Sequence, residues 1–218
     1  MKLRFRTVAV LPLAFILTQI VSAQQNPMAK NPFTADMEFA SKKGRNADEN
    51  IKGTIAVGRQ HMRMQIDQGG PMGGPVTVIN NFASQTSDIL MPTQHMYMEM
   101  KADQNAMARH RSMLPDIKPW DANNPCGHEQ GWTCKDMGTE TVNGRTTEHW
   151  RVTDKEGKTS DAWIDKALMF PIKSVSEDQT WTLTNIKEGE PAASLFEIPR
   201  GYQKMDMGQM MRGAHPQE

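Results

Sequence analysis

Methionine spacing is the feature of this sequence with the most chemical potential. The chain has 18 methionines among 218 residues, and in two stretches they recur at every second position. Side chains two residues apart lie on the same face of a strand. Thioethers gathered there can fill a core, line an adaptable apolar cavity or bind Cu(I) as soft ligands. If the strands that carry these two stretches are neighbours in the sheet, their methionines form a single patch. The candidate cavity residues are Met62, Met64, Ile66, Met96, Met98 and Met100.

A second group of methionines lies at the C-terminal end. Residues 205–218 are polar and rich in methionine, as expected of a loose tail. Four thioethers and an imidazole in such a segment could wrap a Cu(I) ion. The alternative is a disordered tail in which methionine is enriched by chance. The candidate metal ligands are Met205, Met207, Met210, Met211 and His215.

The chain has two cysteines, Cys126 and Cys134, in a short stretch of glycine and polar residues. In an oxidising compartment two such cysteines are expected to form a disulfide. Zinc binding by both cysteines and His128 is the alternative, but the spacing matches no common zinc site and no fourth ligand is evident. A disulfide between Cys126 and Cys134 is therefore the favoured interpretation.

The first 23 residues are typical of a secretory signal peptide. A basic start precedes an apolar stretch over residues 7–21, and Val21-Ser22-Ala23 is a small-residue exit. The apolar stretch is short for a membrane span, which needs about 20 residues. An uncleaved N-terminal anchor is the alternative. We expect a mature chain that starts at Gln24, has no transmembrane segment and is periplasmic or secreted.

Catalytic signatures are missing from the sequence. It contains no Gly-x-Ser-x-Gly elbow, no His-Glu-x-x-His pair and no phosphate-binding loop. We therefore expect a protein that is not an enzyme and needs no cofactor. The 25 basic and 25 acidic residues balance, which excludes a nucleic-acid binder that relies on a bulk basic field.

The elements that must position these side chains are predicted to be short strands. Apolar residues alternate with polar ones from Phe33 onward, and glycine, proline, asparagine and aspartate bound each run. Asn143-Gly144 predicts a two-residue type I′ hairpin turn. One short helix is expected over residues 104–114. The predicted strands cover residues 33–39, 51–57, 62–66, 76–79, 86–91, 96–100, 139–142, 146–152, 159–164, 171–176 and 180–186.

Several motifs in a fixed order resemble a known family. Ala-Trp-Ile-Asp-Lys at residues 162–166 precedes Phe-Pro-Ile-Lys at 170–173, and Ser-Leu-Phe-Glu-Ile-Pro-Arg-Gly-Tyr follows at 194–202. Together they resemble the exported LolA/LolB-like proteins, in a branch without assigned function. The resemblance covers residues 30–204 and implies a strongly curved antiparallel sheet, a half-barrel, with one or two covering helices. It also implies a cavity that holds acyl chains or lipoproteins.

The sequence therefore predicts a mainly β (α+β) protein with one LolA-like domain over residues 24–204. The favoured function is an exported, non-enzymatic binding or carrier module for a lipid or another apolar ligand. Two alternatives remain open: a methionine-rich copper-handling protein, and an envelope protein that binds a protein partner without a small ligand. The sequence does not determine the ligand or the oligomeric state.

Overall fold

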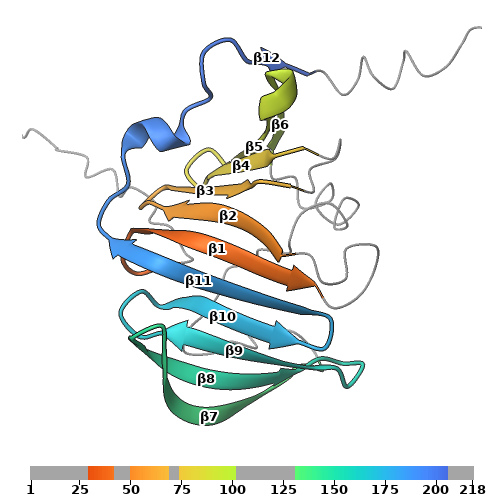
Figure 1. The fold of residues 1–218 in the computed structure, drawn as a ribbon, viewed down its shortest axis with the longest axis vertical. Coiled ribbons are helices and arrows are strands. Elements are labelled where there is room, and N and C mark those ends of the chain that lie inside the picture. Colours follow the sequence, from red (N-terminus) through yellow and green to blue (C-terminus); the bar gives the residue numbers. More distant parts are fainter. Residues whose placement is uncertain (1–28, 42–49, 69–73, 102–130, 206–218) are drawn as a thin grey trace, which may run out of the picture.

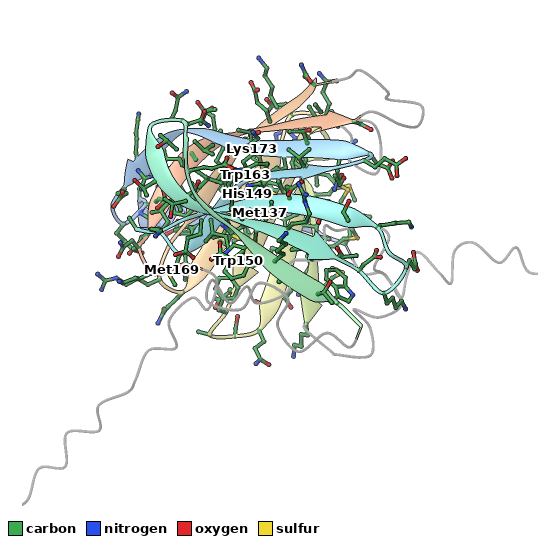
Figure 2. The ribbon with its side chains drawn as sticks, turned by 90° about the horizontal axis from the view of Figure 1, so that it is seen from below. Met137, His149, Trp150, Trp163, Met169 and Lys173 are labelled. Carbon is green, nitrogen blue, oxygen red and sulfur yellow. The ribbon has the colours of Figure 1, made fainter. Side chains whose placement is uncertain are left out.

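The computed structural model describes residues 29–41, 50–68, 74–101 and 131–205. These residues form a single twelve-stranded sheet whose strands follow one another from β12 at the top of Figure 1 to β7 at the bottom. The sheet is open and bent rather than flat (Figures 1 and 2). Its strand order is β12-β6-β5-β4-β3-β2-β1-β11-β10-β9-β8-β7.

Two antiparallel meanders make up most of this sheet. The first contains β1 (Phe33–Ser41), β2 (Asn50–Val57), β3 (His61–Ile66), β4 (Val76–Asn81), β5 (Thr86–Met91) and β6 (Met96–Lys101). The second contains β7 (Thr133–Val142), β8 (Arg145–Thr153), β9 (Thr159–Asp165), β10 (Phe170–Ser176) and β11 (Gln179–Glu188). Antiparallel pairing of β1 with β11 joins the two meanders at the centre of the sheet.

The predicted fold class is confirmed, and each predicted strand lies within one of these eleven. At the β7–β8 turn, Asn143 and Gly144 have φ of 51° and 76°, the two positive values that a type I′ turn requires. The expected helix at 104–114 lies outside the described residues. Within the described ranges the helical elements are two short 3₁₀ segments, η1 (Pro92–Gln94) and η2 (Ala193–Phe196).

One face of the sheet carries the core. Strand alternation places apolar side chains of both meanders on this face, which we call the inner face. Phe33 of β1 and Phe170 of β10 meet edge to face there, with ring centroids 5.2 Å apart. Burying side chains of this size contributes about 1.5–3 kcal/mol each. The buried cluster consists of Phe33, Ala35, Met37, Ile55, Val57, Met62, Met64, Leu168, Phe170, Ile172 and Leu183.

The opposite, outer face is partly covered by the end of the described chain. Residues 189–205, which we call the C-terminal strap, return along this face of the first meander. Phe196 of η2 stacks on His61, and Arg63 Nη1 donates to the Leu195 carbonyl at 3.0 Å. The strap ends in β12 (Gln203–Lys204), which pairs in parallel with β6. This pair is the exception to the predicted antiparallel arrangement.

No helix in the described part of the chain has the length and apolar character that a membrane crossing requires. Residues 1–23, predicted to be a signal peptide, lie outside the described residues.

Candidate functional site

A row of directly opposed side chains crosses the inner face through six adjacent strands. Opposed residues of neighbouring strands share a face, so the register shows which side chains lie together. The row brings one methionine of each predicted set onto the same surface. Its members, from β6 to β1, are Met98, Ile89, Val78, Met64, Ile55 and Ala35.

The two predicted methionine sets share the inner face, but their strands are not neighbours. Strands β4 and β5 separate β3 from β6, which holds the two sets about 14 Å apart at a strand spacing of about 4.8 Å. The fold therefore has two methionine patches instead of one. This separation does not favour a single copper ion shared by both sets.

Burial distinguishes the two patches. Met62 and Met64 are 1% and 7% exposed and belong to the core cluster, whereas Met96, Met98 and Met100 are only partly buried. Ile66 is also partly buried and packs against the core. The sulfurs of β3 thus act as core filling, while those of β6 continue the apolar surface toward the edge of the sheet.

The inner face continues onto the second meander with two tryptophans that the sequence analysis did not select. Trp150 of β8 and Trp181 of β11 lie in one cross-strand row. Phe39 and Phe170 lie close to the Trp181 ring, at centroid distances of 6.4 and 6.3 Å. The alternation in residues 146–152 could have placed Trp150 on a strand face, but the row depends on the register.

On the outer face of β8, β9 and β10, three side chains form a stack. Lys173, Trp163 and His149 are opposed across the strands and follow one another in Figure 2. The Lys173 ammonium lies 4.3 Å from the Trp163 ring centroid, and the His149 ring lies parallel to that indole at 4.4 Å. Cation–π attraction and ring stacking both stabilise this order.

Two carboxylates hold the imidazole within this stack. Glu140 Oε1 lies 2.8 Å from His149 Nδ1, and Asp161 Oδ1 lies 2.8 Å from Nε2. The second oxygen of Glu140 accepts the Trp163 indole N–H at 2.7 Å. A neutral imidazole can donate from only one nitrogen, so both contacts are hydrogen bonds when the ring is protonated.

The same contacts shift the pKa values of the two carboxyl groups. Hydrogen bonds, first from Trp163 and then from His149, lower the pKa of Glu140. Burial raises the pKa of Asp161, but hydrogen bonds from Arg151 and His149 outweigh burial and bring its pKa below the usual range. Both carboxylates are therefore stabilised in the ionised form that the stack requires.

This outer cluster holds the fold together and does not have the arrangement of a catalytic centre. Each nitrogen of His149 already faces a carboxylate, so neither is open to a substrate proton or a metal. Among the described residues, no group of three His, Cys, Asp or Glu side chains is placed to hold a metal ion. His149 is 8% exposed, and its register partner Trp163 covers the imidazole ring.

A buried carboxylate closes the turn beside this cluster. Asp165 is 1% exposed and is bonded to the Arg145 guanidinium, which also donates to Glu188 at 2.6 Å. Asp165 Oδ1 also accepts the backbone N–H groups of Ala167 and Leu168, each at 2.8 Å. The hydrogen bond to Asp165 raises the pKa of Arg145. The turn that leads into β10 is thereby fixed against the core.

The outer face of β5 and β6 presents two acidic side chains side by side. Asp88 and Glu99 are directly opposed, and Lys204 of the strap donates to Glu99 at 2.9 Å. Burial, followed by the charge of Glu99, raises the pKa of Asp88. One oxygen of Asp88 is buried and lacks a hydrogen-bond partner in the structure's described part. Ionised Asp88 therefore opposes folding.

A family model covers most of this sheet. The model described as "Domain of unknown function (DUF4412)" matches residues 33–169. The chain belongs to the DUF4412 family. The matched segment runs from β1 to the turn after β9, so it includes the methionines of both patches and the His149 cluster. No curated protein matches this DUF4412 chain.

Solved structures share the fold at low sequence identity. An uncharacterized conserved protein from Thermus thermophilus is 10% identical, with a TM-score of 0.53, and the match covers 80% of this chain and 90% of that one. MucB in the MucA/MucB complex of Pseudomonas aeruginosa is 17% identical with a TM-score of 0.50. That match covers 77% of this chain but only 56% of the other, so the DUF4412 chain spans little more than half of it.

A LolA superfamily protein from Nitrosomonas europaea is also among the structural matches. It is 8% identical, and the match covers 80% of this chain and 92% of that one with a TM-score of 0.36. That overlap is too low to support a finer assignment. The LolA-like resemblance of the DUF4412 chain therefore depends on its sequence motifs.

Several predicted residues lie outside the described ranges. They include Cys126 of the predicted disulfide, whereas Cys134 lies in β7. Met205 is described, and its backbone N–H donates to the Tyr97 carbonyl at 2.8 Å. The remaining candidate metal ligands fall beyond the described part of the chain: Met207, Met210, Met211 and His215.

Proposed function

We propose that this DUF4412 protein is an exported, non-enzymatic binding or carrier module that holds a lipid or another apolar ligand on the inner face of its sheet. The observation that carries the proposal is the continuity of that face. One row runs from Met64 of the core to Met98 of β6 through apolar side chains alone, whereas the adjacent row from Met62 to Met100 passes through Asn80 and Ser87. Flexible thioethers suit a surface that accepts varied apolar shapes.

The location in the cell is part of the proposal. The signal-peptide pattern of residues 1–23 supports export, with Gln24 as the mature N-terminus. Export would also allow Cys126 and Cys134 to form their disulfide. An intact mass of the purified chain, measured with and without reductant and alkylating agent, tests cleavage and pairing together.

The experiment that tests binding is extraction of the native protein. We would purify the full chain after export by a bacterial host, extract it with organic solvent and identify bound molecules by mass spectrometry. The proposal predicts lipid or another apolar compound in stoichiometric amount. Protein that carries none, and that also fails to bind an apolar fluorescent probe, would refute it.

A matched pair of variants locates the ligand. Met98→Glu places a charge on the inner face of β6, and Lys101→Glu places the same residue on the outer face of the same strand. Burying an unpaired charge against an apolar ligand is costly. We expect Met98→Glu to lose most of the bound compound and Lys101→Glu to retain it. If both variants retain the compound equally, the inner face is not the binding surface.

The edge of the sheet favours a second candidate function, the binding of a protein partner. β7 is the last strand in the order of the described sheet, and its neighbouring Trp132 and its own Met137 are 40% and 38% exposed. Exposed apolar side chains beside an edge strand are suited to strand addition. MucB, which shares the fold, is found in complex with MucA. Partner capture lost in a Trp132→Ser, Met137→Ser variant would support this function.

A further inference from the structure

The inner face of the second meander contains a row with two large and two small side chains. Trp150 of β8 is opposed to Ala162 of β9, Ala162 to Ser174 of β10, and Ser174 to Trp181 of β11. At a strand spacing of about 4.8 Å, the two tryptophan Cα atoms are about 14 Å apart. Ala162 and Ser174 are the two small members of the row and lie between the two tryptophan positions, and we call these two positions the strip.

Both indoles in this row have an unsatisfied polar atom. The Nε1 atoms of Trp150 and Trp181 are buried, and neither has a hydrogen-bond partner within the described structure. Buried indole N–H groups usually have an acceptor, because leaving one unpaired is costly. Two such donors therefore belong to one cross-strand row, and neither has an acceptor among the described residues.

Trp163 shows what the same side chain does when the fold supplies its partner. It lies on β9, one residue from Ala162 and on the opposite face, and its Nε1 donates to Glu140 at 2.7 Å. Within the described ranges, the fold thus provides an acceptor for the outer indole and none for the two inner indoles.

The charges near the row select the type of acceptor. Asp136 of β7 is opposed to Trp150, and Glu148 lies two residues from Trp150 on the same face. Glu148 is paired with Lys166 at 3.3 Å. The inner-face positions of β8–β11 up to two residues from the row carry no Lys or Arg. An anionic headgroup would meet the Asp136 carboxylate and the neutralised Glu148–Lys166 pair there, whereas a neutral ester carbonyl would meet two neutral donors.

From these observations we infer that the strip between Trp150 and Trp181 binds the neutral ester region of an acyl lipid, whose carbonyl oxygens accept the two indole N–H groups. This inference rests on the proposed function, because it names the ligand class of the same inner face. The acyl chain lies along the apolar surface, and the ester group fixes its position at the two tryptophans.

The test compares two fluorescent probes on the full mature chain. Methyl parinarate is a polyene ester with one carbonyl oxygen, whose two lone pairs can accept two N–H groups, and diphenylhexatriene is an apolar polyene without any acceptor. Trp150→Phe and Trp181→Phe each remove an indole N–H but keep an aromatic ring. We expect each to weaken methyl parinarate binding about fivefold, and the double variant about 25-fold, with diphenylhexatriene affinity within about twofold of wild type.

Two further variants serve as controls. Trp163→Phe removes an indole N–H on the outer face and should leave both affinities unchanged in the folded protein. Ala162→Leu fills the strip between the tryptophans and should weaken binding of both probes. Near-ultraviolet circular dichroism confirms that each variant is folded before its affinity is measured.

The outcomes separate the inference from the function on which it rests. Selective loss of ester binding in the double variant supports the inference. Equal loss of both probes, or no loss of either, overturns it and leaves the inner face as an apolar surface without an ester site. A wild-type chain that binds neither probe overturns the proposed function itself.

Discussion

The tryptophans on the two faces of the second meander differ in how their polar atoms are satisfied. On the outer face, Trp163 is stacked on His149, covered by Lys173 and bonded to Glu140. On the inner face, the indole nitrogens of Trp150 and Trp181 are buried without a partner in the described chain. On the outer face the indole has its acceptor within the fold, while the two inner indoles have none among the described residues. The same strands thus stabilise the fold through their outer face, and in our proposal they bind a ligand through their inner face.

The methionine patches of the inner face show a parallel contrast. Those of β3 are closed into the core around Phe33, and those of β6 remain partly exposed. Methionine alone therefore does not mark a binding surface, and its degree of burial decides its role.

The largest effect on stability should come from alanine substitutions that compare the two methionine patches. Met62→Ala removes a side chain that is 1% exposed and should lower the free energy of unfolding by about 2–5 kcal/mol. Met98→Ala removes a partly exposed side chain and should cost less than about 1 kcal/mol. Urea denaturation of the two variants checks this. Equal losses would mean that β6 is as much a part of the core as β3.

The contrast between the tryptophans should give the next largest effect. Trp163→Phe loses a hydrogen bond to a carboxylate and should destabilise the fold by about 1–3 kcal/mol. Trp150→Phe loses ring volume but also removes an unpaired buried donor, so its net effect should stay within about 1 kcal/mol. Thermal unfolding of both variants without ligand measures the difference. A larger loss for Trp150→Phe would show that its indole nitrogen has a partner in the folded chain.

Acid should destabilise the protein by protonating two carboxylates of the outer face. Glu140 and Asp161 have lowered pKa values in the folded state, so their stabilisation is complete above the unfolded values of about 4.3 and 3.9 and is lost as the pH falls below them. Trp163→Phe removes the main cause of the Glu140 shift. Its free energy of unfolding should therefore fall less between pH 5 and pH 3 than that of wild type. Parallel pH profiles would contradict this role of Trp163.

The smallest effect concerns the acidic pair under the strap. The pKa of Asp88 is raised, so its ionised form opposes folding above the folded pKa, and this penalty disappears below the unfolded value of about 3.9. Asp88→Asn should therefore stabilise the protein at pH 7, by less than about 1 kcal/mol because solvent screens the site. The gain should vanish at pH 3. Destabilisation at pH 7 would show that the carboxylate makes a contact the fold needs.

The strands were predictable because each has its own local pattern. Residues 62–66 alternate between apolar and polar side chains, and Asn143-Gly144 specifies its turn without help from the rest of the chain. The first half of β7 was not predicted, because Thr133–Met137 has no apolar alternation and forms a strand only by pairing with β8.

The candidate site was less predictable, because strand order and register are long-range properties. The spacing of Met62 and Met98 predicts a face for each but not the two strands between them. The contact of His149 with Asp161 depends on the pairing of β8 with β9, and no short motif encodes that pairing. Trp150 and Trp181 are 31 positions apart and meet in one row only through β9 and β10.

The measurement that tests the central claim most directly is ¹H–¹⁵N spectroscopy of the indole N–H groups during titration of the full mature chain with a neutral acyl ester. The five tryptophan signals are assigned from single Trp→Phe variants. Our account predicts that the Trp150 and Trp181 signals move downfield as their N–H groups gain an acceptor, while the Trp163 signal stays in place. Saturable binding that leaves the Trp150 and Trp181 signals unmoved would contradict it.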